Sequence, residues 1–308
     1  MKLYLDPGRT RKSINFIDNI VYSRKPDLNG NVMELKMSVM LQNGNSEMKL
    51  AAGLDDELEE NRLMPALLWV PGGGYRGADK NLMTAEMAFL ADAGYVVASM
   101  YYRSSAEGHF PDQIIDVKTA VRFLRAHAQE YGINQECIGI FGRSAGGHLS
   151  ALAAMNSKEY ESEEWGEYSS DVQACCDMFG PVNLVSLMEY DEDQIKNNPD
   201  YRWKTVEETH AGTLMGGDIS TMKERARQAS PSYVISQQMC PVLILHGDSD
   251  PLVPCEISTE FYELLVEAGY ENQTQYYVIK NGGHGSREFF QEKTRQVMRD
   301  FFDRYLKV

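Results

Sequence analysis

The chain has 308 residues, of which 43% are hydrophobic, and a formal net charge of −15. That length and apolar content suffice for a large core, and α/β folds of this size commonly form around one sheet. Nucleic acids and anionic membrane surfaces are bound by basic patches, and the sequence has no Lys/Arg cluster. We therefore expect neither as a partner, and the same charge argues against an acidic polymer as substrate.

The first 16 residues carry charges throughout, and no segment reaches the roughly 18 apolar residues that a membrane span needs. These features predict a cytoplasmic protein without a signal peptide or a membrane anchor. The five cysteines form no C-x-x-C pair, so we expect reduced, mostly buried thiols, no disulfide framework and no metal site.

Residues 31–41 alternate between apolar and polar side chains, which predicts an exposed, antiparallel strand, and an Asn-Gly turn signal follows at 42–47. The acidic run at 55–60 is typical of a solvated surface. A continuous apolar run then ends in PGGGY, 71–75, as a buried strand does where it meets a loop. An amphipathic helix is expected at 110–132, closed by its terminal glycine.

Strand-like and helical segments alternate along the rest of the chain. The further buried strands are predicted at 94–103, 137–142, 172–180, 241–247 and 273–279. Residues 182–234 are polar and too long for an ordinary connection, which is typical of a lid or cap. Its Tyr190, Tyr201 and Trp203 could stack on a ring of the ligand or pack the cap onto the body. The alternation predicts one domain over 1–308, with a mostly parallel central sheet, helices on both faces and functional loops at the carboxyl ends of the strands.

A candidate nucleophile lies in FGRSAGGH, where Ser144 is the centre of a G-x-S-x-G pattern between a predicted strand and a predicted helix. The pattern is weak alone, because a serine at this place can equally cap the helix. A serine hydroxyl attacks an ester only with an imidazole in hydrogen-bond reach and a carboxylate that orients it. Two later loops supply such groups: Asp248 and Asp250 in GDSDPLVP, and His284 in GGHG.

Taken together, these motifs resemble the α/β-hydrolase fold of the esterase/lipase family, and specifically the bacterial carbohydrate (acetyl-xylan and feruloyl) esterase group. The matching segments are PGGGY, YYR, FPDQIIDVKTAVRFLRAHAQEYGIN, IGIFGRSAGGHLSALAA, SPSYVI, HGDSDPLVP and GGHG. They keep the chain order Ser, Asp, His of that fold. The resemblance implies a hydrolase without cofactor or metal, with Ser144 as nucleophile, Asp250 as acid and His284 as base.

The resemblance also implies an oxyanion hole, made by the backbone N–H groups of Gly73, Gly74 and Ala145. Glycines suit this role because they let the backbone approach a tetrahedral oxyanion closely. Relatives usually have a histidine before the three glycines, whereas this chain has Pro71. Proline offers no side-chain hydrogen bond, which leaves the rigidity of the loop in question.

Other residues in the same motifs offer alternatives. His148 lies four residues after Ser144, but its helix leads away from the elbow, so a structural role is favoured. His246 closes an apolar strand and is likewise expected to be structural. Asp248 is the alternative to Asp250 as the acid, with turn formation as its expected role.

The leading hypothesis is a serine carboxylesterase that acts on small soluble esters through an acyl-enzyme on Ser144. Acetylated or feruloylated carbohydrates, acylated oligosaccharides among them, are the substrates that the resemblance suggests. Tyr75, Arg103 and Arg143 border the motifs and are the expected substrate contacts. A prolyl-oligopeptidase-like serine peptidase and a ligand-binding protein of the hydrolase fold without catalysis remain as alternatives. The oligomeric state is left open, a homodimer included.

Overall fold

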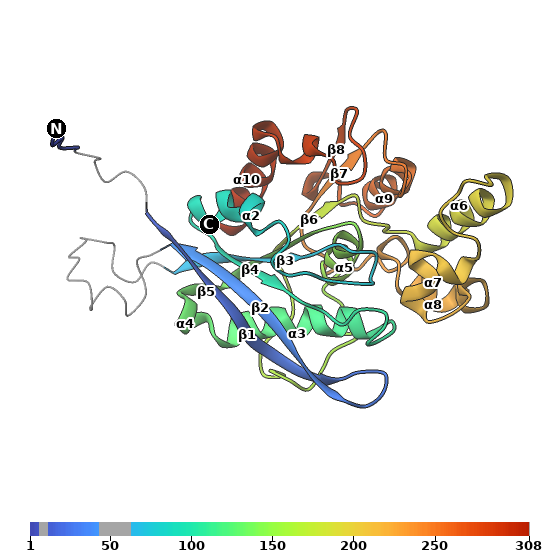
Figure 1. The fold of residues 1–308 in the computed structure, drawn as a ribbon, viewed down its shortest axis with the longest axis horizontal. Coiled ribbons are helices and arrows are strands. Elements are labelled where there is room, and N and C mark those ends of the chain that lie inside the picture. Colours follow the sequence, from blue (N-terminus) through green and yellow to red (C-terminus); the bar gives the residue numbers. More distant parts are fainter. Residues whose placement is uncertain (6–11, 43–62, 308) are drawn as a thin grey trace.

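The computed structural model describes residues 1–5, 12–42 and 63–307, which build an α/β structure around one eight-stranded sheet (Figure 1). The strand order is β1-β2-β4-β3-β5-β6-β7-β8. The strands are β1 (Ile14–Pro26), β2 (Val32–Gln42), β3 (Met64–Val70), β4 (Val96–Met100), β5 (Ile133–Arg143), β6 (Ala174–Met178), β7 (Val242–Gly247) and β8 (Thr274–Ile279). β2 runs antiparallel to β1 and β4, and every other neighbouring pair is parallel. The predicted turn after Gln42 and the acidic run at 55–60 lie outside the described residues.

The first two strands differ from the exposed strand expected at 31–41. β2 is antiparallel as predicted, but it lies one strand in from the edge, and most of its side chains are buried. β1 pairs with β2 and forms the edge of the sheet, and this strand was not predicted. Two register shifts, after Ile17 and after Val21, interrupt the alternation that identifies a strand in a sequence.

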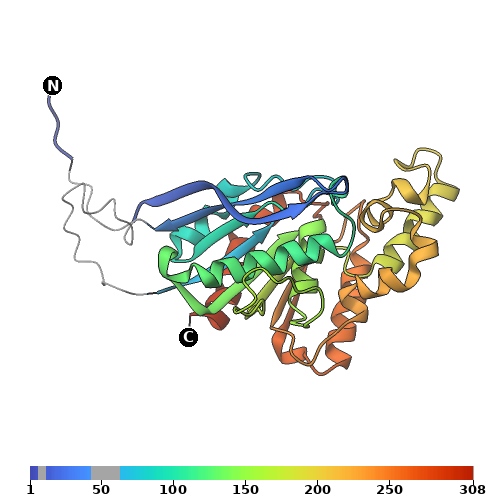
Figure 2. The same cartoon turned by 90° about the horizontal axis from the view of Figure 1, so that it is seen from below.

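Helices cover both faces of the sheet (Figures 1 and 2). One face carries α3 (Asp112–Ala126), α5 (Ala145–Ala153) and α9 (Cys255–Glu267), and the other carries α2 (Thr84–Asp92) and α10 (Glu292–Leu306). The adjacent Cys175 and Cys176 enter the two different cores, because successive side chains of a strand point to opposite faces. The predicted mostly parallel sheet between helical layers is confirmed.

The helix expected at 110–132 is α3 followed by the single turn α4 (Ala128–Tyr131). It ends at Gly132, whose φ of 66° is the left-handed C-cap that glycine favours. All five cysteines are free thiols, and Cys255 is the one that is not fully buried.

The segment expected to be a cap follows β6. It contains α6 (Leu184–Asn197), α7 (His210–Met215) and α8 (Lys223–Gln228), with short 3-10 turns between them. These helices lie together at one end of the sheet, away from the amino terminus (Figures 1 and 2). β6 and β7, the strands on either side of the segment, pair directly with each other, so the insertion does not interrupt the sheet.

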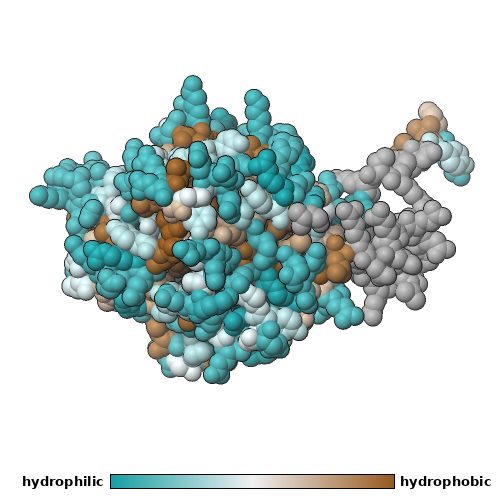
Figure 3. Space-filling view, turned by 180° about the vertical axis from the view of Figure 1, so that it is seen from behind, coloured by the Kyte–Doolittle hydropathy of each residue, from teal (hydrophilic) through white to brown (hydrophobic). Residues whose placement is uncertain are grey.

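On the face in Figure 3, hydrophilic residues predominate and hydrophobic ones form narrow bands rather than one broad patch. Among the described residues, no helix combines the length and the hydropathy that a membrane crossing requires.

A buried ion pair fastens the end of β4 to α3. Arg103, only 4% exposed, donates from Nε and Nη2 to the carboxylate of Asp116, at 3.0 and 2.8 Å. Its Nη1 lies 3.1 Å from Oδ1 of Asp112. The substrate contact expected for Arg103 is therefore wrong, since its guanidinium is committed to α3.

Removing one partner of this pair leaves the other charge buried without compensation. We expect Arg103→Met to lower the free energy of unfolding by about 3–5 kcal/mol. Arg24→Met breaks the exposed pair of Arg24 with Glu34, which solvent screens, and should change the free energy of unfolding far less. Urea unfolding followed by circular dichroism measures the free energy of unfolding of both variants. Equal losses would contradict the larger contribution expected of the buried Arg103 pair.

A further buried carboxylate, Asp177, lies in β6. Its Oδ1 accepts the N–H of Gly180 at 2.9 Å, while its Oδ2 has no hydrogen-bond partner within the described ranges. Burial raises the pKa of Asp177 to about 7, although the nearby His246 and the bond from Gly180 act in the opposite direction. The folded protein therefore retains a proton that an unfolded chain releases at roughly pH 4.

This raised pKa makes stability depend on pH. The contribution of Asp177 is complete at acid pH and is lost as the pH rises through the folded pKa of about 7. Asp177→Asn should remove this dependence, which amounts to about 1.4 kcal/mol for each pH unit between the unfolded pKa of roughly 4 and the folded pKa. Urea unfolding of both proteins between about pH 5 and 8 checks it; parallel pH profiles for the two would refute the assignment.

Candidate functional site

Ser144 occupies a sharp turn between β5, which ends at Arg143, and α5, which begins at Ala145. Its backbone is strained, with φ 53° and ψ −125°, a conformation that residues other than glycine rarely adopt. Two hydrogen bonds hold it: the Ser144 N–H donates to the carbonyl of Met178 at 2.9 Å, and its carbonyl accepts from His148 at 3.0 Å. The strained turn thus presents the hydroxyl at the carboxyl end of the sheet.

The glycines on either side of Ser144 permit this turn to pack closely. A Cβ on Gly146 would lie 2.0 Å from the carbonyl oxygen of Val70, at the end of β3. A Cβ on Gly142 would lie 2.3 Å from the carbonyl oxygen of Gly146. No side chain fits at either position, so the G-x-S-x-G spacing is required by the contact between backbones.

His284 follows β8 and lies between Ser144 and Asp250. Its Nε2 is 2.8 Å from Oγ of Ser144, and its Nδ1 is 2.7 Å from Oδ2 of Asp250. The side chain of Asp250 is fully buried, whereas that of His284 keeps 15% of its surface exposed. The structure therefore brings together the three residues expected from the loops after β5, β7 and β8.

The charge of Asp250 determines the tautomer of His284. Burial alone would raise the pKa of Asp250, but hydrogen bonds from His246, His284 and two backbone N–H groups hold it well below its usual range. An ionised carboxylate can only accept, so Nδ1 of His284 carries the proton and Nε2 accepts from the hydroxyl of Ser144. In this arrangement, Ser144 can transfer its proton to His284 as its oxygen attacks an electrophile.

The rival residues in the same motifs bond to groups other than the hydroxyl of Ser144. Asp248 is exposed, and its Oδ1 accepts the N–H of Asn281 at 2.7 Å, which ties two loops together. His148 is fully buried, its Nε2 lies 2.6 Å from the carbonyl oxygen of Ala229, and burial lowers its pKa to about 4. His246 is also buried and bonds to Ser258 and to the carbonyl of Val253, and its Nε2 lies 3.4 Å from Oδ2 of Asp250, so it supports the acid.

The glycine-rich loop after β3 touches the turn at Ser144. A Cβ on Gly72 would lie 2.8 Å from the carbonyl oxygen of Arg143, so the two backbones are in contact. Gly73 and Gly74 have φ angles of 145° and 59°, which favour glycine. In the described part of the chain their N–H groups have no acceptor, and Ala145, as the first residue of α5, has none within its helix. These three N–H groups are available to an anionic oxygen.

The loop is braced although Pro71 offers no side-chain hydrogen bond. Tyr102 donates its hydroxyl to the carbonyl oxygen of Pro71 at 2.9 Å, and the N–H of Ser105 donates to the carbonyl oxygen of Tyr75 at 2.6 Å. Tyr75 itself is fully buried, with its ring edge-on to that of His148. The substrate contact expected for Tyr75 is therefore wrong, and its contribution is to the packing of the loop.

Arg143 differs from the other two expected substrate contacts. Its half-buried side chain makes no hydrogen bond or ion pair with any residue that the structure describes. A Cβ on Gly285 would lie 3.7 Å from its Nη1, so the guanidinium flanks the loop of His284. It remains a cation beside the site, without a partner among the described residues.

Sequence reasoning missed two ring contacts at the site. Phe179, directly after β6, meets the ring of His284 edge-on at 4.7 Å. His210, at the start of α7, lies against Gly74. Neither residue belongs to a motif; the available signal was that Phe179 follows a parallel strand at its carboxyl end, where the other site residues lie.

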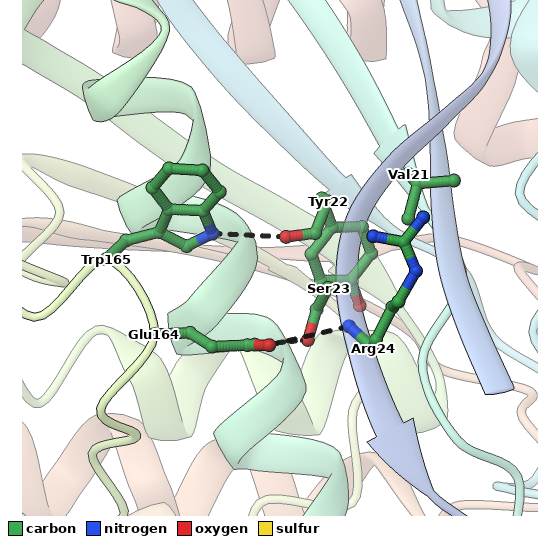
Figure 4. A pocket seen from close by; sticks show the side chains of 6 residues that line it. All are labelled: Val21, Tyr22, Ser23, Arg24, Glu164 and Trp165. Atoms are coloured by element: carbon green, nitrogen blue, oxygen red, sulfur yellow. Dashed lines mark hydrogen bonds between the residues drawn. The ribbon is translucent and has the colours of Figure 1, made fainter. Parts of the chain in front are cut away.

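A separate hollow of about 360 Å³ lies against β1 (Figure 4). Its wall includes Glu164 and Trp165 from the connection that enters β6 at its amino end, whereas Ser144 lies at the carboxyl ends of the strands. Trp165 donates to the carbonyl of Tyr22 at 3.1 Å, and Glu164 accepts from Ser23. These bonds fasten the connection to β1 and contribute nothing to the arrangement around Ser144.

Known proteins are similar in sequence to much of this chain. The family model described as BD-FAE matches residues 55–265. Esterase LipC of Mycobacterium tuberculosis is 31% identical over 224 residues, which are 72% of this chain and 53% of LipC. The isoprenylcysteine alpha-carbonyl methylesterase ICME of Arabidopsis thaliana is 25% identical over 80% of this chain and 56% of its own. The chain spans about half the length of the curated relatives it matches.

Solved structures share the architecture over almost the whole chain. A truncated carbohydrate esterase from gut microbiota superposes with a TM-score of 0.74 at 25% identity and covers 98% of this chain and 99% of its own. Esterase Est2 of Thermogutta terrifontis superposes with a TM-score of 0.68 at 22% identity and covers 96% of this chain and 92% of its own. At that identity the second likeness concerns the fold alone.

Proposed function

The chain belongs to the BD-FAE family and has the α/β-hydrolase fold, and from that premise we propose that it is a serine esterase. Ser144 is the nucleophile, His284 the general base and acid, and Asp250 the group that orients and stabilises the imidazolium. The observation that carries the proposal is the continuous hydrogen-bonded chain from Asp250 through His284 to Oγ of Ser144. The names of the relatives, esterases and a carbohydrate esterase, support an ester bond as the target.

The geometry supports a two-step reaction. Oγ of Ser144 attacks the ester carbonyl carbon as its proton passes to Nε2 of His284, and the N–H groups of Gly73, Gly74 and Ala145 bind the oxyanion. His284 then gives this proton to the departing alcohol, which leaves an acyl group on Ser144. In the second step His284 takes a proton from water, the water oxygen attacks the acyl carbon, and the acid is released as Ser144 regains its proton.

The proposed substrates are small esters of carbohydrates, acetylated or feruloylated, acylated oligosaccharides among them. Two solved proteins support this class at 25% identity: the gut carbohydrate esterase, and the bifunctional GH43-CE of Bacteroides eggerthii, whose match takes in 94% of this chain and 38% of its own. The guanidinium of Arg143 lies beside the loop of His284 and has no partner in the part of the chain that the structure describes, so it suits the hydroxyl or carboxylate oxygens of a sugar. Turnover of a panel of acetyl, butyryl, octanoyl, feruloyl and acetyl-sugar esters tests the class.

Ser144→Ala should lower kcat on these esters by a factor on the order of 10⁴ to 10⁶ and leave the circular dichroism spectrum unchanged. The reason is that the variant lacks the oxygen that forms the acyl-enzyme. Near wild-type turnover by this variant would sink the nucleophile assignment.

The alternative functions are tested on the wild-type protein. Turnover of a proline-linked nitroanilide but not of p-nitrophenyl acetate would favour a peptidase, and turnover of neither would favour a binding protein.

Asp250→Asn and Asp248→Asn form a matched pair in the same loop. The first replaces the acceptor of the His284 Nδ1 proton and should reduce kcat by about 10⁴. The second affects a carboxylate that is exposed and bonded to Asn281, and should cost less than about tenfold. Steady-state kinetics on p-nitrophenyl acetate measures both, and a larger loss at position 248 would reverse the assignment.

A further inference from the structure

His210 joins the insertion to the glycine-rich loop. It is the first residue of α7, and the three heavy atoms nearest to the place of a Cβ on Gly74 all belong to its imidazole, the closest at 2.2 Å. Because Gly74 has no side chain, the ring lies directly on its backbone. The contact joins two segments that are far apart in the sequence.

A second contact, two residues further along the loop, joins the same segments. The guanidinium of Arg76 lies over the indole of Trp203, 4.6 Å from the ring centroid, and donates to the carbonyl of Glu208. Trp203 in turn meets the ring of His210 edge-on at 5.3 Å. We call Trp203, Glu208 and His210 the clasp.

The clasp is itself held firmly. Thr209 is fully buried and caps α7, since its Oγ1 accepts the N–H of Gly212 at 3.0 Å. A Cβ on Gly212 would lie 2.2 Å from the carbonyl oxygen of Val206, so the turn before α7 packs against the helix without spare room. The N–H of Phe110 donates to the carbonyl of Leu214 at 2.9 Å and ties α7 to the body of the protein.

The imidazole of His210 is neutral near neutral pH. Burial is the main cause that lowers its pKa to about 4, and repulsion by Arg76, Arg202 and a protonated His284 adds to it, although its contact with the backbone of Gly74 acts in the opposite direction. A neutral ring adds no charge that would oppose the imidazolium of His284 during the reaction. His210 therefore acts on Gly74 as a neutral ring in direct contact with its backbone.

We propose that His210 is a positioning residue that fixes Gly74, so that the N–H of this glycine is aimed at the oxyanion; this inference rests on the proposed esterase function. Tyr102 and Ser105 hold the two ends of the loop, and the ring of His210 restrains it between them. Contacts to the oxyanion form only in the transition state, so loss of this restraint lowers kcat and leaves KM unchanged.

The test compares His210→Ala with wild type on p-nitrophenyl acetate. We expect kcat to fall roughly 10- to 100-fold while KM stays within about threefold, and labelling of Ser144 by a fluorophosphonate to slow in parallel. His210→Gln, whose flat amide can lie on Gly74, should recover most of the rate. The control is His127→Ala, which removes a ring that stacks on Phe123 at 4.0 Å at the far end of α3 and should leave both rates unchanged.

An unchanged kcat in His210→Ala, or a loss confined to KM, would overturn this inference. If that variant does not fold by circular dichroism, Trp203→Ala takes its place, because it removes the ring that supports His210, and a wild-type kcat then overturns the proposal equally. Wild-type protein that neither hydrolyses esters nor reacts with the fluorophosphonate would instead refute the esterase proposal itself, and this inference would fall with it.

Discussion

The site depends on the contact of Gly146 with the carbonyl oxygen of Val70, where two backbones meet with no side chain between them. β3 and β5 are adjacent and parallel, so their carboxyl ends lie side by side, with Val70 opposite Gly142. The loop that carries Gly73 and Gly74 leaves the first strand at the same place where the strained turn at Ser144 leaves the second. Strand pairing thereby places the backbone of Ser144 beside N–H groups that have no acceptor among the described residues, independently of the side chains of His284 and Asp250.

Three buried aspartates show how the neighbouring donors and charges decide the protonation and the role of a carboxylate. Asp250 lies beside two imidazoles and two backbone donors, and it stays ionised. Asp177 has one backbone donor and an oxygen without a partner among the described residues, and it holds its proton up to about pH 7. Asp116 meets a guanidinium in a bidentate pair and serves as an anchor for the end of β4. The same residue type thus orients a histidine, closes a turn and fixes a helix.

Much of the sheet could be predicted, because buried parallel strands appear in the sequence as short apolar runs. The three loops that hold Ser144, Asp250 and His284 follow such runs, so their meeting at one edge followed from topology. β1 could not be predicted, since its register shifts disturb the alternation. A position next to a motif in the sequence did not predict substrate contacts. Arg103 forms a buried ion pair with Asp116 of α3, and no local sequence pattern indicates this pairing. His210 was missed for the same reason, because its contact with Gly74 exists only in three dimensions.

The insertion begins and ends between two strands that pair directly with each other, as Cys175 does with Val242. Its ends are therefore held at a fixed separation by the sheet, and changes in its length alter the cost of loop closure only slowly. Such a segment can be lengthened, shortened or replaced during evolution while the hydroxyl, imidazole and carboxylate remain in place. If the clasp acts as proposed, this freedom has a limit, because any replacement that reshapes the ligand-binding surface must still place a flat group on Gly74. Divergence of specificity in this architecture would then be constrained by one small contact more than by the size of the inserted segment.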